Sequence, residues 1–154
     1  MQFKHTQEIN APAEYVFARM TDFKKFETHE GPKLFSYKRH GRLPVRIGTR
    51  WDISGPVRGR TRRFSAELSQ YIPPRVLSYK SASSKYEGVL SVTIKPIDAT
   101  NCALHIQVVA KSRGFAIGLI FNSIRLARKR INKRANTELA KFANRLAREY
   151  QAGL

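Results

Sequence analysis

The stretch "YEGVLSVTIKPIDATNCALHIQVVA", residues 86–110, decides the fold of this chain because polar and apolar residues alternate along most of it. Alternation with a period of two predicts strands over 85–97 and 101–111, and the turn residues "DATN" between them predict an antiparallel hairpin. The apolar residues of one parity are Tyr86, Leu90, Val92, Ile94, Leu104, Ile106, Val108 and Ala110. One face of the hairpin is therefore dry, and another element must cover it.

The chain before this hairpin supplies more strands of the same kind. "FKHTQEI" near the N-terminus alternates as a first strand, and "NAPAEYVFARM" and "TDFKKFE" then favour two short helices. Further on, the period returns to two, with turn residues such as "GRLP", "SGPVRG" and "IPP" between the runs. These runs predict strands over 33–40, 46–54, 59–71 and 75–82, and an antiparallel meander is the topology they favour.

The last quarter of the chain predicts the helix that covers the dry face. Helical periodicity extends over about 116–150, and at 1.5 Å per residue such a helix is roughly 50 Å long. At ~100° per residue, one apolar stripe runs along it. The members of this stripe are Ile117, Ile120, Phe121, Ile124, Ile131, Ala135, Leu139, Phe142 and Leu146. We expect the whole chain, 1–154, to form a single domain in which this helix lies across the sheet.

This order of elements resembles the START/Bet v 1-like helix-grip superfamily, also called SRPBCC. The resemblance rests on "INAPAEYVFARMTDFKKFE", "IGTRW", "YIPPRVLSYKS" and the hairpin quoted above, and it covers nearly the full chain. The polyketide cyclase/dehydrase and lipid-transport branch, with its coenzyme-Q-binding relatives, is the most similar. The resemblance implies an α+β fold: a curved antiparallel sheet of about seven strands wraps around a long C-terminal helix, with two short helices after the first strand.

The same resemblance implies a cavity between the sheet and the helix. Most family members use this cavity for sterols, lipids, quinones, polyketides or other apolar small molecules, and a few branches are enzymes. None of the matching motifs is catalytic, and a fold alone does not transfer an activity.

The charge of the chain indicates its partners. Twenty-nine Lys and Arg residues against eleven Asp and Glu residues give a formal net charge of +18, which attracts polyanions and anionic lipid. The single cysteine, Cys102, excludes an internal disulfide and fits a reducing compartment. The N-terminus lacks the apolar stretch of a signal peptide, and no run of about 18 apolar residues occurs. We therefore expect a cytoplasmic protein, peripheral to a membrane at most.

Recognisable catalytic and metal-binding motifs are missing from the sequence. The four histidines lack metal-ligand spacing such as H-E-x-x-H, and there is no C-x-x-C, G-x-S-x-G or phosphate-binding loop. We interpret His105 as a solvated residue and Cys102 as a small core residue. No catalytic residue, metal or cofactor is therefore predicted.

Strand and helix periodicity indicates which side chains line the expected cavity. These are Trp51, Arg62, Phe64, Tyr86, Leu90 and Val92 from the strands, and Phe121, Ile124, Arg128 and Asn132 from the helix. For the apolar members, the alternative is ordinary core packing. Arg128 is the unusual member, because an inward guanidinium is unfavourable unless it finds an acceptor. It either pairs with an internal carboxylate, reaches to the rim, or meets the carboxylate, carbonyl or hydroxyl of a ligand.

A second, smaller apolar stripe lies on the opposite side of the predicted helix and continues into basic residues. The stripe and its basic continuation are Phe115, Leu119, Leu126, Lys129, Arg130 and Lys133. Apolar residues flanked by Lys and Arg are what a helix needs to rest on the anionic headgroups of a membrane. The alternative is that the apolar residues pack against the first helices or loop edges, while the basic ones are merely solvated.

The sequence leaves three hypotheses of function open. The first is a protein that binds, and carries or presents, an apolar small molecule such as a lipid, quinone or polyketide. The second is an enzyme of the cyclase or dehydratase kind, in which Arg128, Tyr86 or Trp51 orients a polyketide-like chain. The third is a basic module that binds nucleic acid or the ribosome. Phosphate attraction supports it, and the resemblance adds a ribosome-associated branch near the coenzyme-Q-binding relatives, but stacking aromatics are not evident.

Overall fold

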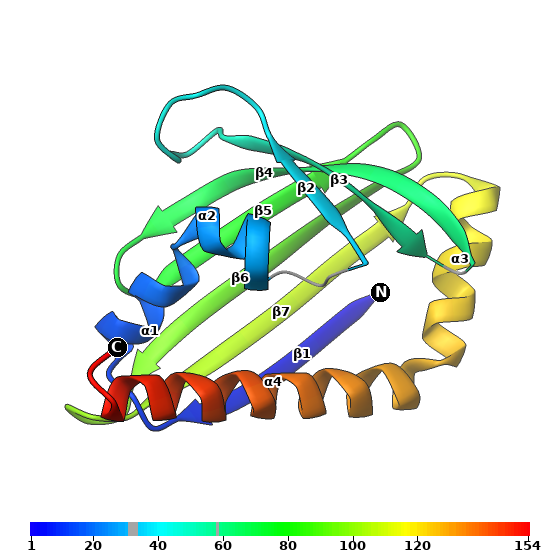
Figure 1. Ribbon diagram of the computed structural model, residues 1–154. Coiled ribbons are helices and arrows are strands. Elements are labelled where there is room, and N and C mark those ends of the chain that lie inside the picture. Colours follow the sequence, from blue (N-terminus) through cyan, green and yellow to red (C-terminus); the bar gives the residue numbers. More distant parts are fainter. Residues whose placement is uncertain (31–33, 58) are drawn as a thin grey trace.

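The computed structural model describes residues 1–30, 34–57 and 59–154. The elements are β1 (Gln2–Ile9), α1 (Ala13–Met20), α2 (Phe23–Lys25), a π-helical segment η1 (Phe26–Glu30), β2 (Ser36–Arg39), β3 (Arg50–Val57), β4 (Arg60–Ile72), β5 (Val76–Ala82), β6 (Tyr86–Pro96), β7 (Cys102–Ser112), α3 (Phe115–Leu126) and α4 (Arg128–Gln151). The strands form one antiparallel sheet in the order β1-β7-β6-β5-β4-β3-β2, which curves around the helices (Figure 1). The predicted α+β helix-grip fold is confirmed.

The hairpin that decided the fold forms as predicted. Ile94 pairs with Leu104 and Val92 with Ile106, so the apolar parity of β6 lies beside the apolar parity of β7. Successive side chains of a strand point to opposite faces, and this register therefore makes one continuous apolar face. We call it the inner face, because the helices lie on this side of the sheet (Figure 1).

Several boundaries differ from those expected. The strand predicted over 46–54 begins only at Arg50, because residues 46–49 form a turn. In this turn the Arg46 backbone N–H donates to Thr49 Oγ1 over 3.0 Å, and Gly48 adopts a φ of 94°, which favours glycine. Residue 33, where another predicted strand begins, lies outside the described residues.

The two short helices after β1 connect the sheet to the end of the chain. Asp22 caps α2, since its side chain accepts a hydrogen bond of 3.2 Å from the backbone N–H of Lys25. An ion pair between Arg19 and Glu149 links α1 to the last turns of α4. The C-terminal end of α4 is thereby fixed beside α1 (Figure 1).

The prediction of one continuous helix over 116–150 is wrong. The chain forms two helices, α3 and α4, which meet at Ala127 with a sharp change of direction (Figure 1). The Ala127 backbone has left the helical region, with φ −91° and ψ 12°. Tertiary packing explains the break, because α4 runs along the edge strand β1 whereas α3 packs against β7.

The fully buried core gathers at one end of the molecule, where α1 and the last part of α4 meet the sheet. Its largest members are Ile9, Val16, Leu68, Leu77, Ile94, Cys102, Leu104 and Leu146. Leu146 belongs to the predicted apolar stripe, and two further stripe members, Leu139 and Phe142, pack against this core. By contrast, α3 has no buried residue although its sequence is strongly apolar. The two ends of the inner face are therefore covered unequally.

Candidate functional site

The inner face has a closed end and an open end. At the closed end Ile94, Leu104 and Leu146 each keep only 1% of their surface exposed. At the open end, large apolar side chains of the inner parity stay partly exposed. These are Phe64, Tyr86 and Leu90 on the strands and Phe121 and Ile124 on α3. A face with accessible apolar side chains on both the sheet and its covering helix can accept an apolar guest.

The predicted cavity residues divide between these two ends. Trp51 and Val92 are buried members of the packed core, with 6% and 5% exposure. The Trp51 ring lies 5.7 Å from the ring of Phe23 and 6.0 Å from that of Tyr79, measured between centroids. These two cavity candidates therefore contribute to packing in this structure, while Phe64, Tyr86 and Leu90, which we call the apolar floor, stay partly exposed.

Gly55 shapes the wall of the open end on β3. A Cβ atom at this position would lie 2.4 Å from the Phe35 ring, so only glycine leaves room for that ring. Phe35 in turn packs edge-on against Phe64, with 6.4 Å between centroids. Sequence reasoning missed Phe35, although the glycine within an alternating strand was a signal for the close approach of another group.

Arg62 is a cation of the inner parity at this end. It shares the parity of Phe64 on β4, lies opposite Gly55 on β3, and is partly buried. Its Nε donates to the backbone oxygen of Val57 over 3.4 Å, which is a weak hydrogen bond. Within the described part of the chain, no carboxylate pairs with Arg62. Its guanidinium keeps most of its donors available.

A pair of hydroxyl groups also lies on the inner face. The Tyr86 hydroxyl and Ser81 Oγ are 2.8 Å apart and hydrogen-bonded, and they come from the neighbouring strands β6 and β5. Ser81 pairs with Gly88 in the sheet, one inner-face position along from Tyr86. The open end thus combines an apolar floor with a small number of polar groups.

Arg128 does not occupy the inward position expected for it. Its side chain is exposed, its Nη2 donates to the Gln2 backbone oxygen over 3.1 Å, and its Cζ lies 5.5 Å from the centroid of the Phe3 ring. The break at Ala127 explains the difference, because counting 100° per residue through a bend gives the wrong direction. Asn132, one turn further along α4, is partly buried.

Glu27 forms a polar cluster that sequence reasoning missed. One oxygen, Oε1, accepts hydrogen bonds of 2.7 Å from both Arg39 Nε and Trp51 Nε1. The carboxylate is only 16% exposed, so its charge is held by these two donors. The π-helical segment η1 brings Glu27 over β3, and no spacing in the sequence indicates such a segment.

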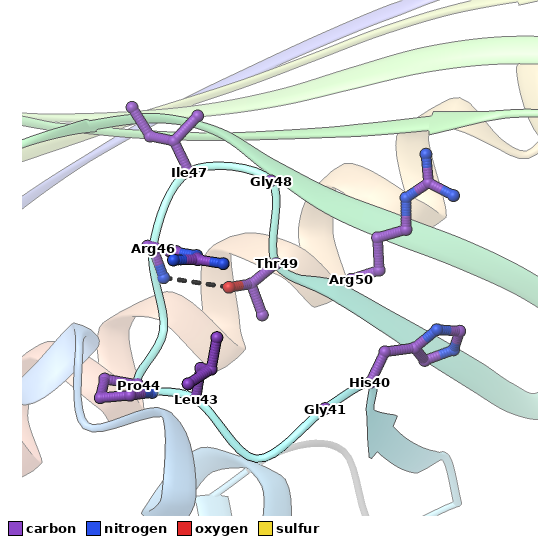
Figure 2. Close-up of a pocket in the computed structure, with 9 residues that line it drawn as sticks. All are labelled: His40, Gly41, Leu43, Pro44, Arg46, Ile47, Gly48, Thr49 and Arg50. Carbon is purple, nitrogen blue, oxygen red and sulfur yellow. Dashed lines mark hydrogen bonds between the residues drawn. The ribbon is translucent and has the colours of Figure 1, made fainter.

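A separate hollow lies in the loop between β2 and β3, lined by residues 40–41, 43–44 and 46–50, with a volume of ≈ 390 Å³. Figure 2 shows Leu43 and Thr49 directed into this loop, while Ile47 and Arg50 point away from it. The His40 ring at its edge is paired with Asp52 over 2.8 Å. Because the charged groups do not converge, we assign no chemistry to this hollow. Among the described residues, no group of three or more His, Cys, Asp or Glu is arranged to hold a metal ion.

The chain resembles known proteins in sequence and in fold. A sequence model of the family described as polyketide cyclase / dehydrase and lipid transport matches residues 1–151. The Zhui aromatase/cyclase from Streptomyces sp. R1128 has a TM-score of 0.72 at 14% identity, over 99% of this chain and 97% of that one. Norcoclaurine synthase from Thalictrum flavum, in complex with dopamine and hydroxybenzaldehyde, has a TM-score of 0.68 at 11% identity, over 97% and 87%.

A third similar structure is the di-domain aromatase/cyclase StfQ of the steffimycin biosynthetic pathway. Its TM-score is 0.71 at 13% identity, and the match covers 99% of this chain but 52% of that one. Searching the curated proteins gave no match. In the described residues, no helix combines the length and the apolar character needed to cross a membrane.

Proposed function

This chain belongs to the polyketide cyclase / dehydrase and lipid transport family, and from that premise we propose that it binds an apolar small molecule between the open end of its sheet and α3. The ligand's apolar body covers Phe64 and Leu90 on the strands and Ile124 on α3. Fold membership alone does not supply this function.

The contrast between the two ends of the inner face carries the proposal. Ile94 on β6 and Leu104 on β7 are almost completely buried. Leu90 has the same parity as Ile94 on β6, but its side chain stays partly exposed. Each methylene group that a ligand removes from water contributes about 0.8 kcal/mol, and the apolar floor supplies the complementary surface. Contact between water and the apolar side chains of this face is unfavourable, and a bound apolar ligand removes that contact.

The polar groups at the open end favour a ligand with one anionic or oxygen-bearing head. A guanidinium donates several hydrogen bonds in a fixed plane, which suits a carboxylate or a carbonyl. Arg62 has no carboxylate partner in the described chain and therefore takes the orienting role that the sequence had suggested for Arg128. The Tyr86 and Ser81 hydroxyls provide a second polar contact.

Two fluorescent probes test the proposal. N-phenyl-1-naphthylamine is a neutral aromatic molecule, and 8-anilinonaphthalene-1-sulfonate adds one anionic group to a similar body. We expect both probes to bind, and Leu90→Trp to weaken each about tenfold, or about 1.4 kcal/mol, because the larger side chain fills the floor. Val89→Trp is the matched control, since Val89 lies next in sequence on the outer face.

The same probes separate the head group from the apolar body. We expect Arg62→Gln to weaken the sulfonate probe severalfold and to leave the neutral probe unchanged. Arg63→Gln is the matched control, because Arg63 is exposed on the opposite face of β4. Equal effects of the inner and outer variants would show that the probes bind elsewhere, and the proposed site would be wrong.

A second candidate function is cyclisation or dehydration of a bound polyketide-like chain. The observation that favours it is the Tyr86–Ser81 hydroxyl pair on the inner face, since an enzyme needs polar groups beside its bound substrate. A poly-β-keto thioester analogue tests this candidate. Protein-dependent loss of water, measured by mass spectrometry and reduced in Tyr86→Phe, supports it, while binding without turnover supports the carrier function alone.

A further inference from the structure

We propose that α3 docks the protein onto an anionic lipid bilayer, with Phe115, Leu119 and Leu126 at the membrane interface. This role is additional to ligand binding, because it uses the outer side of the helix. The structure provides an uncovered apolar face, a surrounding cationic surface and a position at the open end of the sheet.

The apolar face of α3 is defined by these three residues, which are 85%, 56% and 82% exposed. At ~100° per residue they fall within about 40° of one another on the helix, on the side opposite Ile117, Ile120 and Ile124. None of the three side chains is buried. Large apolar side chains that are exposed together on one helix face indicate an interaction site more strongly than a single exposed one.

The sequence around this face is rich in cations. Between Asp98 and Glu138 the sequence contains no acidic residue. The basic residues of that interval are Lys111, Arg113, Arg125, Arg128, Lys129, Arg130, Lys133 and Arg134. The exposed Lys and Arg residues of early α4 follow directly on Leu126. Apolar residues that enter the interface beside cations that meet anionic headgroups are the combination a membrane-surface helix uses.

The same charge argues against other occupants of this face. A second copy of the chain would bring the basic surfaces together, which like-charge repulsion disfavours. A nucleic acid would satisfy the cations and stack on Phe115, but it would leave the aliphatic Leu119 and Leu126 without an apolar partner. An anionic bilayer supplies both negative charge and hydrocarbon.

The position of α3 determines which end of the protein faces the membrane in the proposed docked state. The helix begins directly after β7, and the Arg113 backbone N–H in the connection donates to the Lys85 backbone oxygen of the β5–β6 turn over 2.6 Å. An ion pair of 2.5 Å between Arg113 and Glu87 fixes the same connection. α3 therefore starts from an anchored point at the end of β7 (Figure 1). In the proposal, docking by its outer side places the open end next to the bilayer.

Vesicle co-sedimentation tests the proposal. The vesicles consist of phosphatidylcholine alone or of phosphatidylcholine mixed with phosphatidylserine, at physiological salt. We expect binding only to the mixed vesicles, and a loss of about tenfold or more in affinity for Phe115→Ser combined with Leu126→Ser. Leu43→Ser combined with Ile72→Ser is the matched control, because these side chains are 62% and 50% exposed and lie in the β2–β3 loop and at the end of β4. Circular dichroism confirms that each variant is folded.

A charge-reversal pair completes the experiment. We expect Lys129→Glu with Lys133→Glu to abolish binding, and Lys38→Glu with Lys80→Glu to retain most of it, although both pairs change the net charge equally. The proposal is overturned if the native protein ignores phosphatidylserine, or if the serine variants of α3 bind as the native protein does. Tight binding of a single-stranded RNA that the serine variants retain, without vesicle binding, would assign the surface to nucleic acid instead.

Discussion

Glu27 and Trp51 are joined by a hydrogen bond of 2.7 Å between a carboxylate oxygen and the indole nitrogen, and the same oxygen accepts from Arg39. This contact holds η1 against β3 and fixes the Trp51 ring beside Phe23 and Tyr79. The ring closes the inner face on the β3 side. The Glu27 carboxylate thus fixes the positions of both the Arg39 and the Trp51 side chains.

Glu27→Ala therefore destabilises the fold. We expect a loss of about 1–3 kcal/mol in the free energy of unfolding, because two donors lose their acceptor in a mostly buried place. Trp51 is the only tryptophan, so its emission should also shift to longer wavelength in the native state. Urea denaturation followed by fluorescence measures both effects. Glu138→Ala is the control, since its carboxylate is 64% exposed; an equal loss in the two variants would contradict the role of Glu27.

The closed end of the inner face holds the buried core, whereas α3 has no buried residue. We expect Leu146→Ala to lower the free energy of unfolding by about 2–5 kcal/mol, because the deletion leaves a cavity among buried neighbours. Leu126→Ala removes the same atoms from a side chain that is 82% exposed and should change stability by less than about 0.5 kcal/mol. Thermal or urea unfolding compares them. Similar losses would mean that α3 packs more tightly than its exposure indicates.

Sequence periodicity predicted the sheet well, because the alternation of apolar and polar residues is a local feature of each strand and one face of the sheet is apolar. The parity of Ile94 and Leu104 alone placed both residues in the core. It also placed Leu90 on the inner face, but parity does not reveal whether an inner residue is sealed or accessible. That distinction depends on which helix lies above it.

The helix break at Ala127 and the Glu27 cluster could not be predicted from periodicity, because both depend on how distant segments pack. Ala127 favours helix, and the bend there arises from packing of α3 and α4 against different strands. Because of this bend, Arg128 donates to the Gln2 backbone oxygen. The register of β4 does not depend on the bend, and Arg62 lies opposite Gly55. Glu27 reaches Trp51 through a π-helical segment, for which the sequence has no periodic signal.

Cys102 should be unreactive in the native protein. Its side chain is fully buried, and burial raises the pKa of its thiol, with the nearby Glu14 carboxylate acting in the same direction. Because the thiolate is the reactive form, we expect Ellman's reagent to label Cys102 only at the rate of unfolding. Labelling in native buffer and in urea measures this difference. Complete labelling of the native protein within mixing time would contradict the burial of Cys102.

Tyr79 makes the protein sensitive to alkali. Burial raises the pKa of its phenol from 10.0 to about 12. The native state therefore keeps a proton that the unfolded chain loses, so the stabilisation is fully present below pH 10 and is lost as the pH rises toward 12. We expect native stability to fall more steeply over this window than that of Tyr79→Phe. Urea midpoints measured across the window test it, and parallel curves would contradict the assignment.

Methyl-resolved NMR with N-phenyl-1-naphthylamine tests the central claim most directly, namely that the inner face accepts an apolar guest at its open end. We expect intermolecular contacts and shift changes at Leu90 and Ile124, and none at the sealed methyl groups of Ile94 and Leu104. Contacts confined to exposed residues such as Leu119, with Leu90 and Ile124 unchanged, would contradict it.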